Sequence, residues 1–339
     1  MDSINGKLIA AIQDAVPLQP DCWDVLGGSL GISGTEVSGR IAGLRDEGII
    51  REISGIFDLT RAGYRQSLVA FRLPEDRLHE GGNTVAGHPG VSHCYGRGGA
   101  YNLWFTLAVS SSSKLGLDGT VGRLAEISGA AGSMILPTIQ RFKLAPRFNP
   151  EGPVAMSLNS AGKESGETLS LTEDDREIIR ALQVDLPACA DPFGVIVADR
   201  GVESVDVLLS AAKRYLDAGL MRRYAAVLHH RAAGAKANVM VVWDVPDAEM
   251  EIAGQAAAQD PAVSHCYSRP VFPDWPFGLY TMVHGRSDEE VAGAVERIAS
   301  AAGITERSRR LELFTTKEFA KRRVKLFSPE ESSWEASTS

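Results

Sequence analysis

The chain has 339 residues, of which 44% are hydrophobic and 7% aromatic, and its formal net charge is −8. This composition is typical of a globular protein and excludes a largely disordered chain. The longest apolar runs, such as residues 238–245, are too short to cross a membrane, and the N-terminus lacks the ordered regions of a signal peptide. We therefore expect a cytoplasmic protein.

The cysteines and the charge exclude further classes. Cys22, Cys94, Cys189 and Cys266 show no spacing typical of a zinc site, so free thiols are expected rather than disulfides or a metal centre. The negative net charge argues against nucleic-acid binding in general, although the segment 306–327 is locally basic.

The first predicted element in chain order is a helix-turn-helix. Apolar residues recur near the helical period through 30–44, and Gly48 ends the helix before a strand-like segment. This order is typical of a winged helix-turn-helix, which we assign to residues 1–60.

The rest of the first half alternates strands and helices. We predict four strands, near residues 67–73, 91–97, 102–110 and 134–144. This is the order of a ferredoxin-like domain, assigned to 61–148. Residues 149–170 are rich in Pro, Gly and Ser and are predicted to be a linker.

The second half repeats this plan. Residues 171–231 are assigned to a second winged helix-turn-helix, with Gly219 in the place of Gly48. A second ferredoxin-like domain is assigned to 232–327, and residues 328–339 are predicted to be a flexible tail. The segments behind this second domain are a strand at 237–245, a helix at 247–259, strands near 263–269 and 277–285, a helix at 288–302 and a strand after 307.

A repeated tetrapeptide marks the duplication. Ser-His-Cys-Tyr occurs in residues 87–97 and again in 259–270, and the flanking residues also agree. Chance recurrence of a string that holds His, Cys and Tyr is very improbable. The predicted fold class is therefore α+β, a tandem duplication of a winged helix-turn-helix followed by a ferredoxin-like βαββαβ domain.

The presumed DNA-reading helices are poor in positive charge. The first offers Thr35, Glu36, Ser38, Arg40 and Arg45, and the second offers Asp199, Glu203 and Asp206. A DNA-binding helix needs cations for the phosphates and donors for the base edges. We expect a retained scaffold without specific DNA binding.

Side chains alternate across a strand, so the repeated motif has two faces. One predicted face holds Val263, His265, Tyr267 and Arg269, with His93, Tyr95 and Arg97 as its counterpart in the first half. The other face holds Ser264, Cys266 and Ser268. Helices cover one face of a ferredoxin-like sheet, and small side chains suit that packed side. We therefore expect Cys94 and Cys266 in the core, and the His-Tyr-Arg row facing a partner sheet or a ligand.

Three long motifs, at residues 30–58, 228–245 and 263–287, carry a family resemblance. The combined domains resemble the Lrp/AsnC regulators, and the longer motifs resemble the siroheme decarboxylase branch with both subunit types fused in one chain. The resemblance implies AsnC-type domains and a carboxy-lyase activity. That activity removes CO2 from the C12 and C18 acetate side chains of siroheme, giving 12,18-didecarboxysiroheme in heme d1 synthesis or the related alternative heme pathway. No cofactor beyond the iron tetrapyrrole substrate is implied.

Siroheme carries carboxylates around a flat, iron-bearing ring, so its site needs basic clamps, aromatic walls and an imidazole. Histidine suits the proton transfer because its ordinary pKa lies near neutrality. The residues expected to act in catalysis are His265, His229, His93 and Arg269. Those expected to bind the substrate are Arg97, His230, Arg231, Lys236, Asn238, Tyr267, Trp275 and Tyr95. His265 or His229 is the candidate axial ligand of the substrate iron.

The two copies differ where the chemistry is expected. Between Arg97 and Tyr101 the first half has only Gly-Gly-Ala, whereas the second half carries a longer loop with Trp275. We therefore expect the second half to form most of the pocket, completed across a pseudo-twofold axis by the first half. Two alternatives stay open. Trp275 is either a turn anchor or an aromatic wall of the pocket, and His284 is either a structural or a pocket residue.

Two other functions also stay open. An Lrp/AsnC-type regulator would use the first helix-turn-helix on DNA and sense an effector, and a non-catalytic carrier would hold siroheme without releasing CO2. The partners considered are further siroheme decarboxylase subunits and a second copy of the chain. Because each chain holds two family units, an internal pseudo-dimer is expected.

Overall fold

The computed structural model describes residues 2–144, 169–228, 237–304 and 306–338. The chain forms two compact units. The first, the helix-turn-helix unit, comprises Met1–Tyr64, Ser165–Ala232 and Lys325–Pro329, and the second, the ferredoxin-like unit, comprises Arg65–Glu164, Ala233–Val324 and Glu330–Ser339. Within the described ranges, no helix is both long and apolar enough to cross a membrane.

The helix-turn-helix unit contains both predicted winged helices. The first consists of α1 (Ser3–Asp14), α2 (Cys22–Leu30), α3 (Gly34–Asp46) and β1 (Ile50–Phe57). The second consists of α6 (Glu173–Leu182), α7 (Pro192–Arg200), α8 (Val205–Asp217) and β7 (Met221–Leu228). Gly48 and Gly219 both adopt φ +68°, the left-handed conformation that ends α3 and α8. The strands β1 and β7 pair antiparallel, so the two wings form one ribbon.

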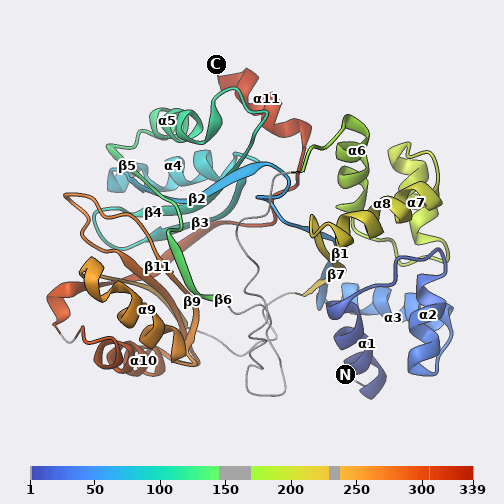
Figure 1. The fold of residues 1–339 in the computed structure, drawn as a ribbon, viewed down its shortest axis with the longest axis horizontal. Coiled ribbons are helices and arrows are strands. Elements are labelled where there is room, and N and C mark those ends of the chain that lie inside the picture. The colour runs from blue at the N-terminus through green and yellow to red at the C-terminus, as the bar shows by residue number, and fades with distance from the viewer. Residues whose placement is uncertain (1, 145–168, 229–236, 305, 339) are drawn as a thin grey trace. The chain divides into compact units, whose positions relative to one another are not determined.

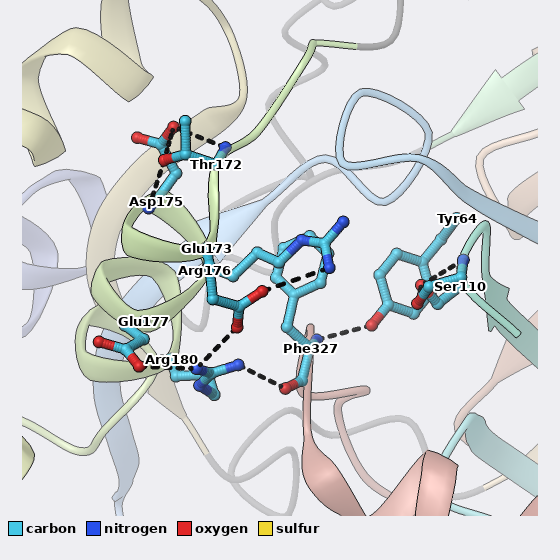
Figure 2. A network of polar contacts seen from close by, with 10 residues as sticks. Tyr64, Ser110, Thr172, Glu173, Asp175, Arg176, Glu177, Arg180 and Phe327 are labelled. Carbon is cyan, nitrogen blue, oxygen red and sulfur yellow. Dashed lines mark hydrogen bonds and ion pairs between the residues drawn. The ribbon is translucent and has the colours of Figure 1, made fainter.

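A short segment near the C-terminus belongs to this same unit. The backbone N–H of Phe327 donates to the Tyr64 hydroxyl at 2.6 Å, and Arg180 Nη1 donates to the Phe327 carbonyl at 3.2 Å. Figure 2 shows the Glu173 carboxylate between the side chains of Arg176 and Arg180. Its oxygens lie 3.5 Å from Arg176 Nη1 and 3.3 Å from Arg180 Nη2. These contacts hold Phe327 at φ +57°, a conformation that side chains other than glycine rarely adopt.

The ferredoxin-like unit contains the predicted fold twice. The first copy runs β2 (Tyr64–Arg72), η1 (Glu75–Arg77), α4 (Leu78–Ala86), β3 (Val91–Arg97), β4 (Leu103–Ser110), α5 (Gly116–Ser128), β5 (Gly132–Leu136) and β6 (Gln140–Leu144). The second runs β8 (Ala237–Trp243), η3 (Asp247–Glu249), α9 (Met250–Gln259), β9 (Val263–Ser268), β10 (Leu279–Gly285), α10 (Asp288–Ala301), η4 (Arg307–Arg309) and β11 (Arg310–Lys321). The α+β prediction with its tandem duplication is confirmed.

One nine-stranded sheet joins the two copies, in the order β5-β2-β4-β3-β11-β8-β10-β9-β6. Figure 1 shows α4 and α5 beside the strands of the first copy, and α9 and α10 beside the strands of the second. Each helix pair covers its own apolar cluster, around Phe105 in the first copy and Trp243 in the second. Cys94 and Cys266 lie in these two clusters, as expected. A third cluster, with Trp104 and other residues of both copies, lies on the opposite face of the strands.

The last strand of each copy pairs with the other copy. β6 pairs with β9, and the second part of β11 pairs with β3. An aromatic ring locks each exchange by lying against a helix glycine. A Cβ added to Gly254 would come within 2.4 Å of the Phe142 ring, and one added to Gly82 within 2.4 Å of the Phe319 ring. The internal pseudo-dimer is thus built from exchanged strands.

The predicted flexible tail differs from the structure. Residues Pro329–Thr338 form the helix α11, whose Trp334 ring lies 4.4 Å from the His88 ring. Glu331 accepts a hydrogen bond from the backbone N–H of Ser110 at 2.9 Å. The polar composition suggested a loose end, but one tryptophan and one carboxylate anchor the segment to the first copy.

Candidate functional site

A β-bulge changes the predicted faces of the repeated motif. In β9 the register shifts between Val263 and His265, which pair with two adjacent residues of β10. Ser264 is therefore the extra residue of a bulge. Val263 lies in the helix-covered cluster with Cys266, so the prediction that it shares the face of His265 was wrong. Strict alternation does not hold across a bulge.

Ser264 lies between two imidazoles. Its Oγ is 2.7 Å from His265 Nδ1 and 2.6 Å from His284 Nε2, and 3.5 Å from the Met282 carbonyl. Simple alternation had placed this hydroxyl on the packed side, away from His265, and no periodic signal in the sequence reveals a bulge. The contact places His284 beside His265, and both interpretations of His284, as a structural or as a pocket residue, stay predictions.

Burial favours the neutral form of both imidazoles. Burial is the main cause that lowers the pKa of His265 to about 4, and the charges that His284 and His93 carry when protonated act in the same direction. Burial also lowers the pKa of His284, and the ammonium group of Lys321 adds to that effect. His93 and His265, one from each copy of the motif, thus lie close enough for their charges to interact.

The first copy repeats this arrangement without the second imidazole. Its bulge lies between Val91 and His93 in β3. Ser92 Oγ lies 3.0 Å from His93 Nδ1 and 2.6 Å from Thr106 Oγ1. His93 is exposed, whereas His265 is half-buried. By strand register, Ala108 occupies the position that His284 has in the second copy.

The two arginines of the motif lie at the points where strands cross between the copies. Arg97 Nη1 donates to the Leu313 carbonyl at 2.7 Å, and Arg269 Nη1 donates to the Leu136 carbonyl. Arg97 is only 6% exposed, and this burial lowers its pKa to about 10. In this structure both guanidinium groups therefore hold the strand exchange together.

The tyrosines of the motif lie beneath these arginines. The guanidinium carbon of Arg97 lies 5.5 Å from the Tyr95 ring centre, and that of Arg269 lies 5.2 Å from the Tyr267 ring centre. At these distances a cation is attracted to an aromatic face. Tyr95 and Tyr267 are half-buried.

Trp275 is almost fully enclosed by protein. It is 3% exposed, its Nε1 donates to the Tyr280 hydroxyl at 2.8 Å, and its ring packs 5.5 Å from Tyr101 and from Trp104. The neighbouring Asp274 accepts a hydrogen bond from the Tyr101 hydroxyl at 3.0 Å. These contacts favour the interpretation of Trp275 as an anchor that fixes its loop on the first copy.

The remaining expected site residues are distributed as follows. Asn238 is exposed and pairs directly with His284 across β8 and β10, so both side chains lie on one face. Lys321, which sequence reasoning missed, pairs with His93 across β11 and β3. His229, His230, Arg231 and Lys236 lie outside the described residues. In the described part of the chain, no group of three or more His, Cys, Asp or Glu residues is arranged to hold a metal ion.

Paired ferredoxin-like domains combined with winged helices have the architecture of an AsnC-type protein. The family model of the AsnC-like ligand binding domain matches residues 61–143 and 232–320. The model of the siroheme decarboxylase NirDL-like HTH domain matches residues 5–51.

Similarity to known proteins extends over nearly the whole chain. A siroheme decarboxylase of Hydrogenobacter thermophilus is 34% identical, covering 97% of this chain and 96% of the relative. A siroheme decarboxylase NirDL subunit of Paracoccus denitrificans is 32% identical, covering 90% of this chain and 91% of the relative. The crystal structure of the siroheme decarboxylase NirDL with an iron-uroporphyrin III analogue matches with a TM-score of 0.79 and 30% identity, covering 99% of this chain and 98% of the other. The chain belongs to the siroheme decarboxylase family.

Proposed function

We propose that this chain is a carboxy-lyase that removes CO2 from the C12 and C18 acetates of siroheme, giving 12,18-didecarboxysiroheme for heme d1 or alternative heme synthesis. The observation that carries the proposal is the histidine cluster. The two copies of the motif place His93 and His265 close enough for their charges to interact. Ser264 lies within hydrogen-bond distance of both His265 and His284. The chain belongs to a family in which one solved structure, the siroheme decarboxylase NirDL, contains an iron-uroporphyrin III analogue.

His265 is the proposed proton donor. Loss of CO2 leaves an electron pair that the conjugated ring can accept, and a positioned acid must then protonate the new methyl carbon. Ser264 occupies His265 Nδ1, so Nε2 is the ring nitrogen left for the substrate. Because the pKa of His265 is low, we expect the neutral ring to donate its Nε2–H while its Nδ1 takes up a proton in return.

Substrate binding is assigned to groups around this cluster. Lys321 and Asn238 lie next to His93 and His284 in the sheet and can bind carboxylates. Tyr95 and Tyr267 are proposed as apolar surface for the ring, and Arg97 and Arg269 as the positive charges behind them. The further proposed contacts are His230, Arg231 and Lys236, and His229 is the remaining candidate for the substrate iron.

The second copy is the better equipped catalyst. His265 has a second imidazole within reach of its serine, whereas the serine beside His93 meets the hydroxyl of Thr106. We therefore assign the first decarboxylation to His265, and binding or the second decarboxylation to His93.

A binding titration tests the first half of this proposal. Siroheme added anaerobically to micromolar protein should shift its absorbance, with saturation at about one equivalent per chain. CO2 release in the same cuvette distinguishes the enzyme from a carrier. A saturable shift without CO2 release would indicate a carrier, and an unchanged spectrum would contradict both functions.

A further inference from the structure

We propose that Ser264 is a positioning residue that couples the ring tautomers of His265 and His284, so that a proton given up at His265 Nε2 is matched by one that reaches His265 Nδ1 through Ser264. The use of this relay in catalysis rests on the proposed decarboxylation. The coupling itself is a property of the free protein and can be tested without a substrate.

The geometry of the hydroxyl carries the inference. Ser264 Oγ has one hydrogen to donate and two lone pairs to accept, and ring nitrogens lie at 2.7 and 2.6 Å. A single hydrogen cannot serve both nitrogens, so at least one ring must donate its own N–H. The third neighbour, the Met282 carbonyl, is 3.5 Å away, at the outer limit of a hydrogen bond. The two imidazoles are therefore the preferred partners.

Two arrangements of neutral rings place the Ser264 hydrogen between the imidazoles, whereas in a third both rings donate to Ser264 Oγ and the hydroxyl donates along the longer 3.5 Å contact to the Met282 carbonyl. In the first, His284 donates its Nε2–H to Ser264, Ser264 donates to His265 Nδ1, and the proton of His265 is on Nε2, as a donor requires. In the second, the direction is reversed, and His265 Nε2 carries a bare lone pair. When the Ser264 hydrogen lies between the rings, as the shorter contacts favour, the tautomer of one ring fixes the tautomer of the other. The lowered pKa values of both rings are consistent with neutral imidazoles.

The proton transfer balances along this chain of bonds. The carbon–carbon bond to the carboxylate breaks, CO2 leaves, and the electron pair passes into the macrocycle. A carbon–hydrogen bond then forms with the proton from His265 Nε2. The Ser264 hydrogen moves to His265 Nδ1, the His284 Nε2 hydrogen moves to Ser264, and His284 Nδ1 takes a proton from water. This transfer leaves the cluster in the second arrangement. It returns to the first when His265 Nε2 takes a proton from solvent, His284 Nδ1 releases one, and the two hydrogens between the rings pass back through Ser264. One proton is consumed for each CO2, and no oxidant or reductant is needed.

The first copy provides an internal comparison. Ser92 has the same neighbour in the sequence, with its Oγ 3.0 Å from His93 Nδ1, but its other partner is the Thr106 hydroxyl. A hydroxyl can rotate to donate or accept, so it does not impose a tautomer as an imidazole does. Ser92→Ala is therefore the matched control for Ser264→Ala.

The coupling is tested by nitrogen-15 NMR of the histidine rings in the free, full-length protein. Ser264→Ala should shift the ring nitrogen signals of both His265 and His284, and Ser264→Thr, which keeps a hydroxyl, should largely preserve them. Ser92→Ala should shift the signals of His93. Unchanged His284 signals in Ser264→Ala would overturn the coupling.

The role of the Ser264 relay in catalysis is tested by measuring turnover with siroheme. Ser264→Ala should slow CO2 release about 100-fold while the siroheme dissociation constant stays within about threefold, and Ser264→Thr should restore most of the rate. The rate plotted against the deuterium fraction of the solvent should be curved in the wild type, because several protons move together, and linear in Ser264→Ala. A rate near wild type in Ser264→Ala, or no recovery in Ser264→Thr, would overturn the relay. If the wild type itself released no CO2, the proposed function would be wrong, while the NMR result would still decide the coupling.

Discussion

His265 and His93 share one motif but differ in their surroundings. His265 is half-buried and reaches a second imidazole through Ser264, whereas His93 is exposed. Removing His265 should therefore slow the first decarboxylation by about 100-fold or more, because it removes the proposed acid. His93→Ala should have a smaller effect on the first step, or leave a mono-decarboxylated product.

The product distribution of the two variants decides this assignment. Equal losses at both positions would indicate one composite site, and full activity in His265→Ala would remove this residue from the mechanism. Arg269→Ala is a less specific probe, because its guanidinium also holds the Leu136 carbonyl at the strand crossing.

His88 makes stability depend on pH. Its Nδ1 accepts a hydrogen bond from the backbone N–H of Gly90 at 3.0 Å, and burial lowers its pKa from 6.5 to about 4. Between these two pKa values the unfolded chain binds a proton at His88 and the folded chain does not. The contribution of His88 to the free energy of unfolding is therefore fully present above about pH 6.5 and is lost as the pH falls toward 4. When the pH is lowered from 7 to 5, protonation of this histidine in the unfolded chain should lower the free energy of unfolding by about 1–2 kcal/mol.

Urea unfolding at the two pH values checks this prediction. His88→Asn keeps an acceptor for Gly90 but cannot titrate, so the loss of stability on acidification should shrink. The same change at the exposed His79 serves as the control and should keep the wild-type difference. An unchanged pH dependence in His88→Asn would contradict this account.

The exchanged strands depend on two glycines, Gly82 and Gly254. Gly254→Ala should destabilise the protein by about 1–2 kcal/mol, because the new methyl group would meet the Phe142 ring at 2.4 Å. Gly293→Ala in α10 is the control. Its Cβ would have only an arginine side-chain atom at 3.9 Å, so this change should be neutral or stabilise the helix by up to about 1 kcal/mol.

Thermal unfolding of Gly254→Ala, Phe142→Ala and the double variant completes the test. The double variant should be more stable than the sum of the single losses predicts, because removing the ring removes the collision. Strict additivity would mean that Phe142 does not lock the strand exchange.

The strands and helices could be predicted because their periodicity is local. The expected segments 91–97 and 263–269 correspond to β3 and β9. Because the chain is duplicated, the pattern of each element occurs twice in the sequence, and each copy supports the prediction for the other. Two features left no periodic signal. The bulge moves the Ser264 hydroxyl to the imidazoles, and the pairing of β6 and β11 with the opposite copy depends on contacts between residues far apart in sequence.

At the scale of the molecule, the winged helices are predicted to be scaffolds rather than DNA readers. Arg40 forms ion pairs with Asp2 and Glu36, and Arg45 pairs with Asp185 at 2.6 Å. The basic side chains of α3 are thus already engaged within the protein. Filter binding at physiological salt should show no preference for the promoter fragment of its own gene over unrelated DNA. Selective retention of that fragment would support the regulator interpretation.

The mass of the tetrapyrrole after anaerobic incubation of the wild-type protein with siroheme tests the decarboxylation most directly. We expect successive loss of two CO2 molecules, with one hydrogen from solvent added at each new methyl group. Incubation in deuterated water would label each of these positions once. Siroheme recovered unchanged, at protein concentrations that saturate binding, would contradict the claim that this chain is a decarboxylase.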